Sequence, residues 1–403
     1  MSTRVIVVGG GIVGSATAYF AAREGCDVVL IERAQCGFGA SGRNPGFVWL
    51  HCRNAGFALD ISRASRRLYT HLAHELPGAF DFRTNGGLIY FNTPEQGAVF
   101  DEFVAARRRD GLDIELIDGT EVRRLVPPIR DDVLGASFCS EDAQINTPSV
   151  VRALVEGARR EGADVREETA VDELLLAGDA IAGVRCGEKR IEADAVVVAT
   201  GAWSNELLAA VDLELPIGAE RLQVVGTEPL PIEIRPVVYG PLAAKQYTLF
   251  RDLPSWSDDL FAAPYEEELG VEMLQLVAQR ATGEVLMGCP MDYPPGVDMR
   301  PTLAGLHATA RSIGDDFPGL LGAPIERVWA GALPYTTDML PVIDEARPGL
   351  FIASGHVFGN AAGPMTGMLI SQLIRGHQPD LDLSECRFGR AVAEVHAGTP
   401  SRW

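Results

Sequence analysis

The chain has 403 residues, 47% of them hydrophobic, and a formal net charge of −20. This length predicts two domains, and the acidic balance argues against nucleic acid or an anionic membrane surface as a main partner, since both attract a positive surface. Seven cysteines are scattered without a Cys-x-x-Cys pair, and neither a secretory signal nor a membrane-spanning apolar run is visible, so we expect reduced thiols, no metal site, no transmembrane segment and a cytoplasmic location.

The first forty residues carry the most informative motif. Residues 4–8 form a short apolar run that ends in glycine, as expected of a buried parallel strand, and the segment SATAYFAARE after it is helix-like. Between them Gly9, Gly11 and Gly14 form G-x-G-x-x-G, and Glu32 ends a second apolar run. The glycines permit a tight turn, close approach of a pyrophosphate and close helix packing, while the acid can accept ribose hydroxyls. Together these features predict a dinucleotide-binding βαβ unit.

Two further stretches favour FAD over NAD as the dinucleotide. A second glycine-rich loop, CGFGASGRNPGF, directly follows the acidic residue, where an NAD dehydrogenase needs none. Later, the apolar run 195–199 ends in Thr200-Gly201, which is typical of a strand that passes under a dinucleotide and also of an ordinary turn after a strand. Glycine-rich approaches near the start, middle and end of the chain suit a long ligand that lies across the fold.

The last glycine-rich stretch, GHVFGNAAGPMTG, occupies residues 355–367. Pro364 suits a first helical position, the apolar residues after it recur at helical spacing, and Gly376 stands where a helix would end. A helix N-terminus attracts negative charge because its first N–H groups have no helical partner. The stretch is therefore either a tight packing loop or a place where main-chain donors reach an anionic ligand.

The rest of the chain contains two kinds of segment. INTPSVVRALVEGARREG predicts an amphipathic helix closed by Gly162 and followed by a strand, which completes a parallel sheet with 195–199 and GLFIASG. Short β-like runs separated by Pro, Gly and Asp, such as GGLIYFNTPE, RLQVVGTEPL and GEVLMGCP, predict a mixed or antiparallel sheet. We therefore expect an α/β fold with a Rossmann-type FAD-binding domain on a parallel sheet and a second, substrate-binding domain.

Taken in order, these motifs resemble those of the FAD-dependent D-amino-acid oxidase, glycine oxidase and sarcosine oxidase superfamily. The resemblance covers nearly the whole chain and rests on VVGGGIVGSATAYFAAREGCDVVLIER, GASGRNPG, VVVATGAWS, VWAGALPYTTDMLPVI and GHVFGNAAGPMTG. It implies two interleaved domains: an FAD-binding domain at 1–80, 141–215 and 326–390, and a substrate-binding domain at 81–140 and 216–325. It also implies an oxidase or dehydrogenase that oxidises the C–N bond of a small amino or imino acid by hydride transfer to flavin N5, giving an imine that water hydrolyses.

The resemblance also assigns the cofactor contacts. Gly359, Asn360 and the N–H groups near Gly363 would stabilise the negative charge that reduction places on the flavin. Val171 matches the strand residue whose main chain meets adenine. The two arginines of the expected set could instead be solvated or salt-bridged surface charges. That set is Gly9, Gly11, Gly14, Glu32, Arg33, Ser41, Gly42, Arg43, Val171, Gly201, Gly359 and Asn360.

The substrate contacts are less clear from the sequence. In KQYTLFRD, a strand would place Tyr247, Leu249 and Arg251 on one face, where a hydroxyl and a guanidinium could clamp a carboxylate. An exposed strand face explains the same pattern. His51 and Arg53 follow the flavin-facing loop and are further candidates for substrate binding.

Leu333 departs from the family pattern. In the glycine oxidase and D-amino-acid oxidase branches, the position that matches Leu333 commonly carries an arginine that grips the substrate carboxylate. Leucine cannot donate a hydrogen bond, and a carboxylate placed against it would be desolvated without a partner. We therefore expect Arg251, Tyr247 or Arg53 to hold the carboxylate, and Leu333 to line an apolar wall for a secondary or bulkier amino acid. No catalytic acid or base is assigned, because the family chemistry requires none.

Other functions fit the same motifs. The fold could oxidise an α-hydroxy acid or a polyol, or it could be a non-catalytic flavin-binding subunit of an electron-transfer complex. Oxygen or a quinone or other electron carrier could accept the electrons, and the chain is compatible with a homo-oligomer. The monomeric sarcosine oxidase branch attaches its flavin through a cysteine just before the segment that matches WAGALPYTTD. That segment has no cysteine here, so we expect FAD to be held non-covalently.

Overall fold

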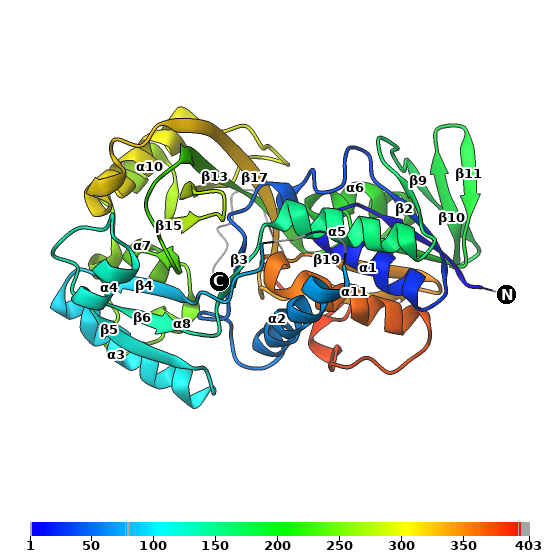
Figure 1. Cartoon of the computed structure of the whole chain (residues 1–403). Helices are drawn as coiled ribbons and strands as arrows, with labels where there is room; N and C mark the ends of the chain where they lie inside the picture. The colour runs from blue at the N-terminus through cyan, green and yellow to red at the C-terminus, as the bar shows by residue number, and fades with distance from the viewer. Residues whose placement is uncertain (1, 77, 79–80, 394, 396–403) are drawn as a thin grey trace.

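The computed structural model describes residues 2–76, 78, 81–393 and 395 of the chain. Two sheets of different construction lie next to each other, and helices cover the near face of the six-stranded one (Figure 1). The six-stranded sheet is almost entirely parallel and the eight-stranded sheet is mixed. The expected fold class, an α/β protein with a parallel sheet and a second mixed sheet, is confirmed.

The six-stranded sheet has the strand order β18-β19-β12-β1-β2-β8. Its strands pair in parallel, except that β18 runs antiparallel to β19. The bounds are Arg4–Val8 (β1), Asp27–Ile31 (β2), Asp164–Arg166 (β8), Ala195–Val198 (β12), Val342–Arg347 (β18) and Leu350–Ser354 (β19).

Both faces of this sheet are buried, which explains why its strands are continuous apolar runs. On β1, Val5 and Val7 pack against the helix layer, whereas Ile6 and Val8 pack against a small antiparallel sheet on the other face. The helices of the layer are α1 (Ile12–Arg23), α2 (Phe57–Glu75), α5 (Thr147–Arg160) and α11 (Gly359–Ile374). The small sheet, which we did not predict, consists of β9 (Glu173–Ala177), β10 (Ala180–Cys186) and β11 (Lys189–Glu192).

The eight-stranded sheet has the strand order β17-β13-β16-β15-β14-β4-β6-β5. Only the β14–β4 pair is parallel within the described strands. The bounds are Gly87–Phe91 (β4), Ile114–Asp118 (β5), Gly135–Cys139 (β6), Ile217–Pro229 (β13), Val237–Tyr239 (β14), Glu272–Gln279 (β15), Glu284–Asp292 (β16) and Ile325–Thr336 (β17).

Alternation along these strands separates two faces. Val225, Val238 and Val277 pack on one side against residues of α4 and α10, while Val224 and Tyr239 point to the opposite side, toward the six-stranded half of the molecule. The helices of this half are α3 (Pro94–Arg109), α4 (Gly119–Leu125), α7 (Pro241–Ala244), α8 (Thr248–Arg251), α9 (Pro264–Leu269) and α10 (Leu303–Asp316). The remaining short elements are β3 (Phe47–Val48), β7 (Ala143–Gln144) and α6 (Ser204–Leu208).

Three sequence predictions about local structure need correction or adjustment. KQYTLFRD is not a strand, because Thr248–Arg251 forms helix α8. Val171 lies in the connection between β8 and β9 rather than in a strand. β17, most of which the expected division places in the FAD-binding domain, pairs with β13 along its length, so we propose that this domain resumes after Thr336. The expected boundary at residue 80 lies outside the described residues.

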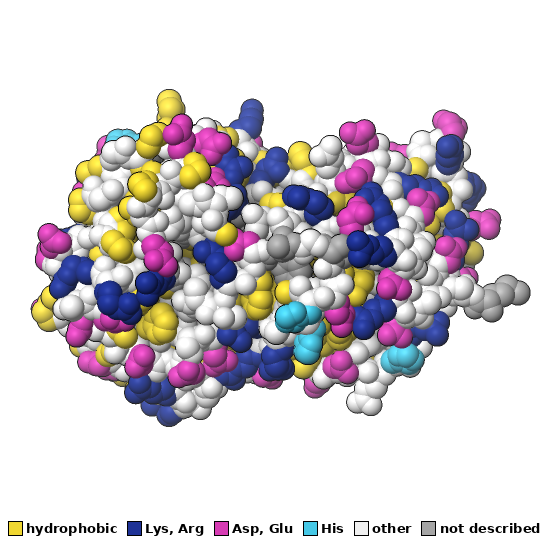
Figure 2. Space-filling view, in the orientation of Figure 1, with side chains coloured by type: hydrophobic (Ala, Val, Ile, Leu, Met, Phe, Trp, Pro, Cys, Tyr) yellow, Lys and Arg dark blue, Asp and Glu magenta, His cyan; other side chains and the backbone are white. Residues whose placement is uncertain are grey.

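Within the described residues, no helix has both the length and the apolar character that a membrane span requires. On the face drawn in Figure 2, basic and acidic side chains are interspersed over both halves.

Candidate cofactor and substrate site

A cavity of about 450 Å³ lies between the two sheets. Part of its lining comes from the carboxyl ends of the parallel strands, where open α/β folds bind their ligands. We call this part the nucleotide region, and it includes Gly9, Gly11, Glu32, Arg33, Ser41, Val171 and Gly201. The other part is one face of the eight-stranded sheet. We call it the apolar wall, and it consists of Leu222, Val224, Tyr239, Leu274, Leu276, Cys289 and Leu333.

The turn after β1 brings backbone segments so close that side chains are excluded. Gly9 has φ of +106°, and a Cβ there would lie 2.5 Å from the carbonyl oxygen of Ala199. A Cβ on Gly14 would lie 1.9 Å from the carbonyl oxygen of Gly9. Gly14 does not line the cavity, and the same holds for Gly42, where a Cβ would lie 2.1 Å from the oxygen of Gly37. These two glycines therefore shape the nucleotide region through packing.

Glu32 closes the same turn. Its carboxylate accepts hydrogen bonds from the backbone N–H of Gly10 at 2.7 Å and of Ala34 at 2.9 Å. These two bonds leave further lone pairs on a carboxylate that lines the cavity, where they can accept the hydroxyls of a ribose. Beside it, the Arg33 guanidinium lies 4.4 Å from the centroid of the Trp203 ring, and both residues also line the nucleotide region.

The loop after β2 is tied to the helices that meet at the cavity. Ser41 Oγ accepts from the N–H of Ile12, the first residue of α1, at 2.9 Å. Asn44 Oδ1 accepts from Thr147 Oγ1 at 2.9 Å and from Asn360 Nδ2 at 2.8 Å. The Asn360 side chain is thus committed to a bridge between α5, α11 and this loop, and its main-chain N–H is the donor left for a ligand.

Helix α11 begins at Gly359, so the prediction that Pro364 is its first residue was wrong. Pro364 lies inside the helix, where it removes the N–H that would bond to the Asn360 carbonyl. The Tyr69 hydroxyl donates to that carbonyl at 2.7 Å and replaces the missing bond. The helix starts without a side-chain cap, which leaves the N–H groups of Gly359 and Asn360 at the cavity without helical partners.

Gly363 lies in the interior of α11 rather than at its beginning. A Cβ there would lie 2.8 Å from the Ile12 side chain, and a Cβ on Gly367 would lie 2.5 Å from that of Ala16. The glycines after the first turn therefore let α11 pack closely on α1, and the two helix N-termini open on the same cavity. The sequence had suggested packing and ligand contact as alternatives for this stretch. In the structure its second half packs on α1, while Gly359 and Asn360 of its first half line the cavity.

The nucleotide region fits the FAD that the resemblance implies. Two adjacent helix N-termini favour an anionic pyrophosphate and a ring that gains negative charge. Gly11 precedes α1 and lines the cavity without a side chain of its own, so a phosphate can approach the main chain there, although the N–H of Ile12 already donates to Ser41 Oγ. Of the twelve expected FAD contacts, the ten that line the cavity are Gly9, Gly11, Glu32, Arg33, Ser41, Arg43, Val171, Gly201, Gly359 and Asn360.

Two arginines of the cavity have no ion-pair partner among the described residues. Arg53 is only 8% exposed, its Nε donates to the Trp49 carbonyl at 3.0 Å, and its guanidinium lies 4.4 Å from the centroid of the Phe358 ring. Arg43 donates to the Phe38 carbonyl and lies over the Phe38 ring, and burial lowers the pKa of its guanidinium. A buried cation without a carboxylate partner favours an anionic ligand.

The other predicted substrate residues do not meet at the cavity. Arg251 is exposed at the end of α8 and is not part of the lining, so it is not placed to hold a carboxylate there. Tyr247 is buried, and its hydroxyl lies beside that of Tyr239, whose own ring does line the cavity. His51 is fully buried and is not part of the lining, whereas Leu333 lines the cavity.

His356 lies in the cavity lining just before α11. Its Nε2 is 2.9 Å from Thr366 Oγ1, and burial lowers the pKa of the imidazole to about 3. The side chain is therefore neutral at physiological pH and adds no charge near the N-terminus of α11. This hydrogen bond to a side chain gives the histidine a structural role.

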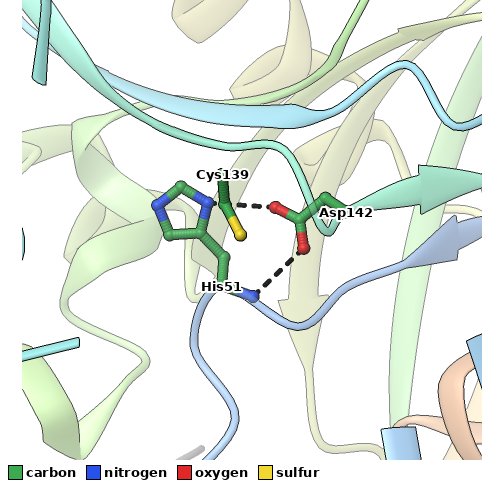
Figure 3. Close-up of side chains that lie close together, drawn as sticks. All are labelled: His51, Cys139 and Asp142. Carbon is green, nitrogen blue, oxygen red and sulfur yellow. Dashed lines mark hydrogen bonds and ion pairs between the residues drawn. The ribbon is translucent and has the colours of Figure 1, made fainter. Parts of the chain in front are cut away.

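His51, Cys139 and Asp142 form a compact buried cluster (Figure 3). Their potential metal-ligating atoms lie within 4.8 Å of one another. The carboxylate of Asp142 is already occupied, since Oδ1 accepts from two backbone N–H groups and Oδ2 lies 3.0 Å from His51 Nδ1. Burial also raises the pKa of the Cys139 thiol, so its sulfur is protonated. These contacts describe a hydrogen-bonded core cluster better than a metal site.

Several residues of the site were not found by sequence reasoning. Asn44 lies in the second glycine-rich loop, residues 36–47, and Trp49 lies two residues after it, but nothing in the sequence pointed to the role of either side chain. Arg107 and Asp142 are fully buried charges on distant elements, and neither belongs to a motif. Their partners become visible only when the chain is folded.

Comparisons with known proteins agree with this geometry. Residues 4–373 match the family described as FAD dependent oxidoreductase. The glycine oxidase of Bacillus subtilis (strain 168) is 28% identical over 391 residues, which cover 94% of each chain. The glycine oxidase from Geobacillus kaustophilus has the same fold, with a TM-score of 0.82 and 22% identity over 97% of this chain and 100% of that one. The L-proline dehydrogenase from P. horikoshii also has it, with a TM-score of 0.81 and 24% identity over 96% of each chain.

Proposed function

Because the chain belongs to the FAD dependent oxidoreductase family, we propose that it binds FAD non-covalently and oxidises the C–N bond of an amino or imino acid. The glycine oxidases among its relatives support this class of substrate. Bound FAD supplies the acceptor for a hydride from the carbon that bears the nitrogen. The protein's own contribution is to bind and orient the substrate and to exclude water.

Arg53 is the observation that carries this proposal. It is a buried guanidinium in a cavity, and it has no carboxylate partner among the described residues. Its Nε is bonded to the carbonyl of Trp49, whose ring packs against Tyr239 of the apolar wall. A substrate carboxylate would supply the missing charge and could be bound through two parallel hydrogen bonds. Arg53 therefore takes over the role of the family arginine that Leu333 replaces.

The apolar wall defines the rest of the substrate. Its leucines, together with Val224 and the Cys289 thiol, offer no partner to a charged side chain, and Tyr239 adds an aromatic ring. Burial raises the pKa of the Cys289 thiol, which keeps it neutral. A bulky apolar or secondary amino acid would cover this wall, whereas glycine would leave it wet. We therefore propose an apolar amino or imino acid as the substrate and expect poor turnover of glycine.

The remaining groups act by electrostatics. The free N–H groups of Gly359 and Asn360 are fixed by α11, so they stabilise negative charge at that end of the cavity without reorganising. His356 stays neutral there. The apolar wall contains no carboxylate among its described residues that could form an ion pair with the substrate amine. The wall also keeps water from the reacting carbon until the product leaves for hydrolysis.

Two finer points belong to the same proposal. Among the seven cysteines, all of which are described and free, Cys289 alone lines the cavity, and its protonated thiol is a poor nucleophile toward a flavin. This supports non-covalent binding. Acid precipitation should therefore leave the flavin in solution, and a yellow pellet would contradict the proposal. Free thiols are typical of a reducing compartment, which supports the cytoplasm as the location.

The decisive experiment measures anaerobic bleaching of the flavin absorbance by a substrate panel. The panel contains both enantiomers of leucine, methionine and phenylalanine, together with proline, glycine, aspartate and the 2-hydroxy acid related to leucine. We expect bleaching by an apolar amino or imino acid and its loss in Arg53→Met, while FAD stays bound. Bleaching by the hydroxy acid alone would indicate alcohol oxidation, and no bleaching by any amino acid would contradict the proposal. Reoxidation in air or by a quinone then identifies the electron acceptor.

A further inference from the structure

The segment Trp49–Arg53 is held from both sides by buried charges. On its N–H side, Asp142 Oδ1 accepts from the backbone N–H of Leu50 at 2.6 Å and of His51 at 3.1 Å. On its carbonyl side, Arg107 donates from Nε to the His51 carbonyl at 3.1 Å and from Nη2 to the Arg53 carbonyl at 2.5 Å. Both charged side chains are fully buried, so these bonds are shielded from competing water.

The His51 side chain fixes the same segment a second time. Its Nδ1 lies 3.0 Å from Asp142 Oδ2, and its Nε2 lies 2.8 Å from Ser137 Oγ (Figure 3 shows the first pair). The imidazole is stacked between Trp49, at 4.7 Å between ring centroids and 8° between planes, and Phe103, at 5.8 Å and 10°. Trp49 is a cavity residue, so the imidazole connects the cluster directly to the lining.

Arg53 forms hydrogen bonds with the first two residues of this segment. Its Nε donates to the Trp49 carbonyl, and its backbone N–H donates to the Leu50 carbonyl, both at 3.0 Å. The direction of the guanidinium is therefore set by a closed turn that Asp142, Arg107 and Ser137 hold in place through hydrogen bonds to its backbone and to the His51 side chain. Neither Asp142 nor Arg107 lines the cavity.

Burying an anion and a cation costs stability unless pairing and hydrogen bonds satisfy both groups. Arg107 is also paired with Asp110, whose Oδ2 lies 2.6 Å from its Nη1, but its other two hydrogen bonds and both of those to Asp142 Oδ1 go to the backbone of the segment that carries the unpaired arginine of the substrate site. We infer that Asp142, together with His51 and Arg107, is a positioning residue that holds the Arg53 guanidinium in the orientation that receives a substrate carboxylate. The inference rests on the proposed carboxylate-binding role of Arg53.

The test uses a ligand that needs no turnover. 3-Methylbutanoate, a carboxylate with an apolar body, is titrated into the FAD-loaded protein, and binding is followed by the perturbation of the flavin spectrum. Because small misplacements of a binding group can weaken its interaction by about 100-fold, we expect Asp142→Ala to raise the Kd about 30-fold and Asp142→Asn about 3-fold. FAD affinity should stay within about 2-fold of wild type, since Asp142 does not line the cavity.

A double-variant comparison separates positioning from general destabilisation. If Asp142 acts through Arg53, the variant that combines Asp142→Ala with Arg53→Met should bind 3-methylbutanoate no more weakly than Arg53→Met alone. Asp316→Ala is the matched control: Asp316 is also a buried carboxylate, accepts from Tyr90 and Gln275, and lies away from the cavity. It should lower stability without changing the Kd.

Each outcome decides between the two proposals. Loss of binding in Arg53→Met but wild-type binding in Asp142→Ala would overturn the positioning role alone, as would additive losses in the double variant. Wild-type binding in Arg53→Met would overturn the role of Arg53 and the positioning role with it. If Asp142→Ala does not fold, Asp142→Asn and Arg107→Lys carry the same comparison. Arg107→Lys retains the charge but cannot reach both carbonyls, and it should also raise the Kd.

Discussion

The two parts of the cavity are built from different materials. In the nucleotide region, the chain offers backbone: glycines that let segments approach within contact distance, and the N-termini of α1 and α11. The apolar wall consists of side chains from five strands of one sheet face, and the proposed carboxylate-binding residue, Arg53, lies on a segment that charges from distant elements support. A site built from backbone tolerates few amino-acid substitutions and is therefore suited to a ligand that does not change. A site made of side chains can change its ligand without changing the fold.

The largest effect is expected where the backbone leaves no space. Gly14→Val places a branched side chain 1.9 Å from the Gly9 carbonyl oxygen and so moves the turn that approaches the pyrophosphate. We expect purified protein without FAD, and no recovery when FAD is added. Gly322→Ala is the control, because a Cβ added there would meet no atom within 4 Å and the φ is ordinary, so this variant should remain yellow. A yellow Gly14→Val protein would show that packing at this turn is not what limits FAD binding.

The next prediction concerns Glu32, whose side chain is part of the nucleotide region. Glu32→Ala removes the acceptor for Gly10 and Ala34 as well as the acceptor for the ribose, and each lost hydrogen bond to a charged group is worth about 1.5–3 kcal/mol. We expect the Kd for FAD, measured by fluorescence quenching on titrating apoprotein, to rise about 10- to 100-fold. Glu24→Ala, an exposed acid at the end of α1, should leave it unchanged. Equal FAD affinity in both variants would exclude Glu32 as a ribose contact.

The same contrast explains what the sequence could predict. Gly9, Gly11 and Glu32 carry their information locally, because a turn, a helix start and a strand end are set by neighbouring residues. The hairpin turns Gly178-Asp179 and Gly187-Glu188 were equally local signals of the small sheet, and we missed them.

Side chains that meet across the fold gave no comparable signal. The segment KQYTLFRD has strand-like alternation, but Phe250 stacks on Phe103 at 3.8 Å between ring centroids, and this packing is satisfied by a helical turn. Likewise, Pro364 resembled a helix start until the Tyr69 hydroxyl was seen to satisfy the Asn360 carbonyl. The Asp142–His51 contact joins residues 91 positions apart and had no pattern to reveal it.

His356 lines the cavity just before α11, and its burial should make stability depend on pH. Its pKa is about 3 in the folded protein and 6.5 in the unfolded chain, so only the unfolded chain binds the proton between these values. The free energy of unfolding should therefore fall as pH falls below 6.5, by about 2 kcal/mol at pH 5, and the loss should stop near pH 3. Urea unfolding of FAD-saturated protein at about pH 8 and about pH 5 should show this extra loss in wild type but not in His356→Gln. The same pH dependence in both proteins would contradict a buried neutral imidazole.

The smallest expected effect tests whether the apolar wall selects the substrate. Leu333 is half-buried on β17, and Leu333→Ala removes three carbons from the wall while leaving the nucleotide region unchanged. Because Leu333 is only half-buried and the other wall residues stay in place, a leucine-sized substrate loses contact worth about one methylene, which is at least about 1 kcal/mol in an apolar pocket. We therefore expect kcat/KM for this substrate to fall about 10-fold and the preference to move toward larger side chains. Leu340→Ala, a half-buried leucine just after the same strand and outside the cavity, controls for lost packing. FAD affinity should be equal in both variants. A substrate preference unchanged by Leu333→Ala, or efficient oxidation of glycine by the wild type, would mean that the substrate side chain does not lie against this wall.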